Sequence, residues 1–111
     1  MTEIEIKKNL AGGEGEVTLH KILKQEQMGK SARMFARVVI AKNSSIGYHE
    51  HVNESETYYI LKGKGLYQDD GKEYEVNPGD VTFCGSHHHH GIQNIGDEDL
   101  EFIALILLGD R

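Results

Sequence analysis

Short runs of apolar and β-branched residues alternate with turn-forming residues along most of this chain, and a sustained helical period is almost absent from the sequence. Each run is short enough for one strand and ends at glycine, asparagine, aspartate or serine. The expected strands are 33–40, 56–62, 66–68, 72–76, 81–84 and 101–108. Asp70-Gly71 is a strong signal for a hairpin turn between two of them. Evenly spaced short strands of this kind predict a β-sandwich or barrel.

The last expected strand is apolar on both of its faces. Neighbouring side chains of a strand point to opposite faces, so one face carries Phe102, Ala104, Ile106 and Leu108 and the other carries Ile103, Leu105 and Leu107. The core of a single domain needs only one of these faces, and the second needs a cover. We expect a homodimer to provide it. The segment around Ile4 and Ile6 is an alternative cover within one chain.

Length and charge narrow the classes of function. The 111 residues suffice for one small domain with a core. Asp and Glu outnumber Lys and Arg by 18 to 12, for a formal net charge of −6, which disfavours nucleic acid and anionic membranes as partners. The sequence lacks both a signal-peptide pattern and an apolar run long enough to span a membrane, so we expect a cytoplasmic protein. The single Cys84 lies in an apolar run and is expected to be an ordinary buried thiol.

Three candidate metal ligands lie within eight residues, at His49, His51 and Glu56. In a strand the two histidines share a face, so they can offer two imidazoles to one ion. The turn-prone stretch 52–55 resets this alternation, and Glu56 can rejoin the pair. A fourth ligand is expected from the run 87–90, which holds four consecutive histidines. Mixed nitrogen and oxygen donors suit a divalent transition metal.

Two motifs in the sequence resemble those of a single-domain cupin. The first cupin motif is glycine, five residues, His-x-His, three or four residues, glutamate, six residues and glycine. This chain supplies His49, His51, Glu56 and Gly63 at that spacing, but Asn43 or Ser44 stands where the leading glycine is expected. The chain also resembles the second cupin motif, in Pro78-Gly79-Asp80 and in a histidine that precedes an asparagine by four residues. That spacing selects His90, before Asn94, although the usual proline-glycine pair does not precede it.

The resemblance implies an all-β fold, a double-stranded β-helix or jelly-roll barrel with a metal at its mouth. We expect an N-terminal extension with edge strands over 1–32 and the cupin barrel over 33–111. The implied ligands are His49, His51, Glu56 and His90, holding one divalent ion of Fe, Mn, Ni, Co or Zn. Strand parity adds Tyr58 and Ile60 to the pocket wall. His88 shares the strand parity of His90, so it is a further candidate for the pocket lining and for a proton carrier behind His90. We interpret His87 and His89 as exposed, Glu54 as a solvated loop residue and Arg37 as an outer-face side chain.

Several functions are compatible with this site. Three imidazoles and one carboxylate leave two positions of an octahedral shell open, so a small oxygen-rich molecule can chelate the ion. The resemblance implies dioxygenase, isomerase, lyase or decarboxylase chemistry without selecting among them, because cupins host all of these. The alternative is a non-catalytic module that binds a sugar or a small acid.

Overall fold

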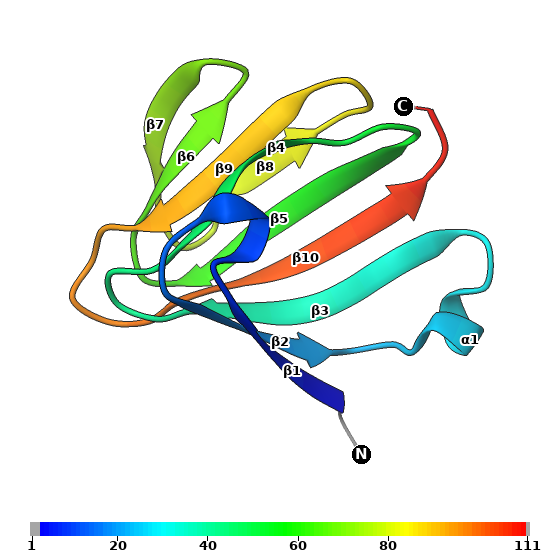
Figure 1. The fold of residues 1–111 in the computed structure, drawn as a ribbon, viewed down its shortest axis with the longest axis horizontal. Helices are drawn as coiled ribbons and strands as arrows, with labels where there is room; N and C mark the ends of the chain where they lie inside the picture. The colour runs from blue at the N-terminus through cyan, green and yellow to red at the C-terminus, as the bar shows by residue number, and fades with distance from the viewer. Residues whose placement is uncertain (1–2, 111) are drawn as a thin grey trace.

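The computed structural model describes residues 3–110, which form two antiparallel β-sheets around one core (Figure 1). The larger sheet has six strands in the order β1 (Glu3–Lys8), β2 (Glu16–Lys21), β3 (Ala32–Ile40), β10 (Leu100–Leu108), β5 (Glu54–Lys62) and β8 (Val81–Cys84). The smaller sheet has four, in the order β4 (Ser45–Glu50), β9 (His89–Asn94), β6 (Gly65–Asp69) and β7 (Lys72–Val76). The helical pieces are η1 (Leu10–Gly12) and α1 (Gln25–Met28). The predicted all-β fold of jelly-roll type is confirmed.

The turns follow the backbone chemistry of their residues. Asp70 and Gly71 have φ angles of 48° and 87° between β6 and β7, which are the two positive values that a type I′ hairpin turn requires. Gly63 ends β5 with a φ of 89°, and a Cβ atom placed there would lie 2.6 Å from the carbonyl oxygen of Asp99. A side chain at this position would therefore be strained and would clash with the backbone.

Strand β5 begins two residues earlier than the sequence suggests. Asn53 has a φ of 58° and turns the chain by itself, and its carbonyl oxygen accepts a hydrogen bond from the backbone N–H of Gly109. The expected turn over 52–55 is therefore shorter, and Glu54 belongs to the strand. Because Glu54 and Glu56 are two residues apart in one strand, both side chains point to the same face.

The core is built from the facing sides of the two sheets. Its largest fully buried side chains include Tyr58, Tyr67, Phe102, Ile40, Ile60 and Ile92. Cys84 at the end of β8 is also buried, and burial raises the pKa of its thiol to about 12. The thiol is protonated at neutral pH, as expected of an ordinary buried cysteine.

The N-terminal strands extend the larger sheet and do not cover it. Ile4 pairs with His20, His20 with Arg37 and Arg37 with Ile103, so these side chains share one face of the sheet. Ile4 and Ile6 are 55% and 61% exposed, and the intrachain cover that the sequence allowed is not formed. None of the helices in residues 3–110 has the length and hydropathy of a membrane span. Residues 1, 2 and 111, at the ends of the expected segments, lie outside the described part of the chain.

Candidate metal centre

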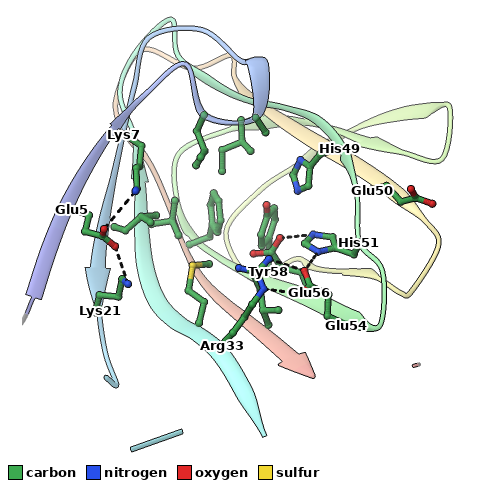
Figure 2. A pocket seen from close by; sticks show the side chains of 18 residues that line it. Glu5, Lys7, Lys21, Arg33, His49, Glu50, His51, Glu54, Glu56 and Tyr58 are labelled. Atoms are coloured by element: carbon green, nitrogen blue, oxygen red, sulfur yellow. Dashed lines mark hydrogen bonds and ion pairs between the residues drawn. The ribbon is translucent and has the colours of Figure 1, made fainter. Parts of the chain in front are cut away.

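The four predicted ligands converge from three strands and one connection. His49 lies on β4, Glu56 on β5 and His90 on β9, and His51 follows directly after β4. One side-chain donor atom from each of the four lies within 4.8 Å of the others. His49 is half-buried, whereas the other three side chains are buried. The chain thus gathers three imidazoles and one carboxylate at one point between the sheets (Figure 2).

Contacts to the Nδ1 atoms of the three rings turn their Nε2 atoms toward this point. His49 Nδ1 lies 2.7 Å from the carbonyl oxygen of Gly47, and His51 Nδ1 lies 2.5 Å from a carboxylate oxygen of Glu54. Both partners are acceptors, so each Nδ1 carries the proton that it donates. The neutral forms of these two rings then carry their free lone pair on Nε2, the atom that a metal ion needs.

His90 is held by two tyrosines. Its Nδ1 lies 2.8 Å from the hydroxyl oxygen of Tyr67 on β6, and its ring stacks on Tyr58 with the centroids 5.1 Å apart. The side chain of His90 is fully buried. These contacts fix the ring so that its Nε2 lies 3.0 Å from Glu56 Oε1 and 3.0 Å from His51 Nε2.

The charges of the cluster favour a cation. Burial alone would raise the pKa of Glu56, but hydrogen bonds with His51 and His90 outweigh it and hold the pKa at about 2, so the carboxylate is ionised. Burial lowers the pKa of His49 and keeps its ring neutral. Burial also opposes charge on His51, but its bonds to Glu56 and Glu54 raise the pKa of that ring. Protons therefore compete with a cation for His51.

The donor set fits a divalent transition metal. Glu56 Oε1, His51 Nε2 and His90 Nε2 lie 3.0 Å from one another, and acceptor atoms this close repel one another unless a proton or a metal ion lies among them. Three nitrogens and one oxygen are the ligands expected of Fe, Mn, Co, Ni or Zn rather than of Mg or Ca. His49, His51, Glu56 and His90 would hold the ion.

Glu54 and Arg33 support His51 from behind. The guanidinium of Arg33 on β3 donates hydrogen bonds of 2.6 and 2.7 Å to the two carboxylate oxygens of Glu54, which contacts His51 in turn. Arg33 is the main cause of the lowered pKa of Glu54. The interpretation of Glu54 as a solvated loop residue is therefore wrong. Arg33 lies 21 residues away from Glu54 in sequence, so no local pattern links the two residues. A strand that starts at Glu54 would have placed this side chain on the same face as Glu56, and that was the one available signal.

Replacing Glu54 by glutamine is expected to weaken metal binding about 10- to 100-fold at neutral pH, the usual effect of removing such a supporting carboxylate. The same change removes a charge that raises the pKa of His51. Since protons compete with the metal at this ring, affinity falls as pH drops through that pKa, and the fall should begin at a lower pH in the variant. Competitive titration with a chromogenic chelator across pH measures both effects.

Glu50→Gln is the matched control, because Glu50 is exposed and points away from the cluster in Figure 2. A Glu54→Gln protein with unchanged affinity and an unchanged pH profile would show that Glu54 does not position His51.

The other expected site residues lie in three different settings. Tyr58 lines the pocket described below, whereas Ile60 is buried in the core and does not reach that pocket. His88 is exposed, and its Nδ1 contacts the carboxylate of Asp70. His87 is exposed and His89 half-buried. Arg37 forms an ion pair with Glu101 and does not line the pocket.

A pocket of about 370 Å³ leads away from the cluster between the sheets. His49, His51 and Glu56 lie at one side of it, and Glu5, Lys7 and Lys21 from β1 and β2 form the opposite wall (Figure 2). Apolar side chains line the space between them, including Leu19, Val38, Phe102 and Ile106. The contribution of β1 and β2 to the site was not predictable from the sequence, since nothing local links them to the histidines.

The likeness to known proteins agrees with this geometry. The model of the family described as Cupin domain matches residues 36–106. The chain is 46% identical over 100 residues to an oxalate-binding protein of Thermotoga maritima, covering 90% of this chain and 83% of that protein. It matches the crystal structure of a predicted oxalate decarboxylase of Thermotoga maritima with a TM-score of 0.93 and 44% identity, covering 96% and 93% of the two chains. It is also 26% identical over 106 residues to a glucose-6-phosphate isomerase of Thermococcus litoralis, covering 83% of this chain and 56% of that protein. The chain therefore belongs to the cupin domain family.

Proposed function

We propose that this cupin binds a small carboxylic acid through one divalent transition metal held by His49, His51, Glu56 and His90. The observation that carries the proposal is the convergence of three Nε2 atoms and one carboxylate oxygen, with the Nδ1 atom of every ring engaged from behind. Four protein ligands leave two positions of an octahedral shell for the ligand. With an ion bound, an acid of the oxalate type would offer two neighbouring oxygens to those positions.

The similarity to a protein named for oxalate binding supports a carboxylate as the ligand class. A bound divalent ion would act as a Lewis acid that polarises the chelated carboxylate. The protein itself contributes a pocket that is apolar over much of its wall, and removing water from such a site strengthens the attraction between an anion and the ion.

The acidic side chains of the pocket favour binding over catalysis. Decarboxylation, isomerisation and elimination each need a group that gives or takes a proton. Glu54 is engaged by Arg33, Glu5 by Lys21 and Glu56 by two histidines. Tyr58 is buried, and burial raises the pKa of its hydroxyl well above the ordinary range. Among the pocket-lining carboxylates of residues 3–110, only Glu50 is engaged in neither a hydrogen bond nor an ion pair, and it points outward (Figure 2).

Calorimetric titration of oxalate into metal-free and Mn²⁺-loaded protein tests this function. We expect heat of binding only from the loaded protein, because the chelated ion supplies the main attraction. The same samples assayed for formate and for oxygen consumption should show no turnover. Tight oxalate binding by metal-free protein would contradict a metal-dependent site, and turnover would show that the site is catalytic.

We also propose that two copies of the chain pair through the outer face of the larger sheet. On this face Ile103 of β10 pairs with Tyr59 of β5, which pairs with Val81 of β8. In the neighbouring row, Leu105 and Phe83 flank Thr57. Tyr59, Val81 and Phe83 are 47%, 62% and 56% exposed. A largely apolar surface over three strands is typical of an interface between subunits.

A further inference from the structure

The pocket is larger than a ligand of the oxalate type needs. Oxalate is two joined carboxylates, and its oxygens would lie beside the histidine cluster. The pocket of about 370 Å³ continues from there to the wall formed by β1 and β2, which is room for roughly twelve water molecules at about 30 Å³ each. A ligand that fills this space therefore has a body beyond its chelating end.

The far wall carries two ammonium groups held by one carboxylate. Lys21 Nζ lies 2.8 Å from Glu5 Oε1, and Lys7 Nζ lies 3.5 Å from Glu5 Oε2. The three groups together carry one net positive charge. An ammonium has three donors, so each lysine can keep Glu5 and still donate to a second anion. Alternation along β1 places Lys7 inside the pocket, whereas its neighbour Lys8 is exposed on the other side.

The surface between the two ends is apolar. Leu10, Leu19, Val38, Ile46, Phe102 and Ile106 are among the residues that line the pocket. Figure 2 shows unlabelled lining side chains between Lys7 and the histidines. A second charged group placed against these side chains would lose its hydration without finding a partner. The middle of a fitting ligand is therefore a hydrocarbon chain, and its charge belongs at the two ends.

From this arrangement we infer that the pocket selects a two-ended acid: one end chelates the metal through two oxygens, an apolar chain crosses the pocket, and a second carboxylate is bound by Lys7 and Lys21. The inference rests on the proposed function for the chelating end. The assignment of the two lysines is separate from it, because a ligand that lacks the second carboxylate would still reach the metal.

Two six-carbon probes isolate the contribution of the lysines. 2-Oxoadipate and 2-oxohexanoate share a chelating 2-oxo acid end, but the first ends in a carboxylate and the second in a methyl group. In Mn²⁺-loaded protein we expect 2-oxoadipate to bind about tenfold more tightly, the effect of one charge-assisted contact at a partly exposed site. Raising the salt concentration should reduce this preference.

A Lys7→Met and Lys21→Met double variant should lose this preference for 2-oxoadipate, because the ammonium groups are gone and Glu5 keeps its negative charge. The matched control is Lys8→Met with Lys72→Met, which removes the same charge from exposed positions outside the pocket. Circular dichroism and metal content are measured for every variant.

Different results would contradict the assignment of Lys7 and Lys21 and the proposed metal-dependent function. Equal affinity for the acids in the unchanged protein, or a preference that survives in the Lys7 and Lys21 variant, would overturn the lysine assignment. Failure of the unchanged protein to take up metal would instead contradict the proposed function.

Discussion

His90→Ala protein is expected to lose more than about 100-fold in metal affinity, whereas His88→Ala protein should bind as tightly as the unchanged chain. The loss exceeds that caused by a supporting residue because a ligand itself is removed. His90 is fully buried with its Nε2 in the cluster, while His88 is exposed and bound to Asp70. Metal analysis after dialysis against a weak chelator, followed by competitive titration, measures the difference.

The two histidines form a matched pair, because they lie two residues apart in the same run and the substitution is identical. Removing His90 also leaves a space beside Tyr58, so the folding of the variant must be checked by its thermal transition. Glu56→Gln changes only the charge and should also bind metal weakly without such a space. Full occupancy in the His90→Ala protein would show that another histidine is the ligand.

Most of the fold was predictable because the local preferences of the sequence for strands and turns agree with the strand pairing in the sheets. Asp70-Gly71 favours a hairpin in isolation, and the sheet requires a hairpin at that point. The ends of the strands depend on contacts that local patterns do not contain. Asn53 adopts a left-handed conformation where its carbonyl oxygen meets the N–H of Gly109, and β5 therefore starts at Glu54.

The convergence of the four candidate ligands was predictable from strand geometry together with the resemblance to the cupin motifs. His49 and His51 need only the two-residue repeat of a strand. His90 was distinguished from three neighbouring histidines by the resemblance to the second cupin motif, in which a histidine precedes an asparagine by four residues. The groups around them are brought together by tertiary contacts. Tyr67 reaches His90 across 23 residues, and Arg33 reaches Glu54 across 21. Patterns within short windows carry no information on such pairs, so the supporting residues and the lysine wall emerged only from the structure.

The unchanged protein is expected to be a dimer at micromolar concentration, with a mass by light scattering of twice the 12.5 kDa of one chain. A Leu105→Glu and Leu107→Glu variant should be a monomer, with a dimer dissociation constant raised at least about 100-fold. Dimerisation of this variant would bury two carboxylates on each subunit without partners, and the lost hydration of these charges opposes association. Both leucines are half-buried on the outer side of β10, so they should tolerate a charge in the monomer.

The control for added charge is a Gln93→Glu and Ile95→Glu variant, in which two exposed positions at the end of β9 receive the same substitution. This variant should remain a dimer. A monomeric mass for the unchanged protein would show that the outer face of the larger sheet is not a subunit interface, and a dimeric Leu105→Glu and Leu107→Glu variant would place the interface elsewhere. Because the metal ligands point to the inner side of the sheets, the monomeric variant should bind metal as the dimer does. We therefore expect that the dimer, if it forms as proposed, does not complete the site.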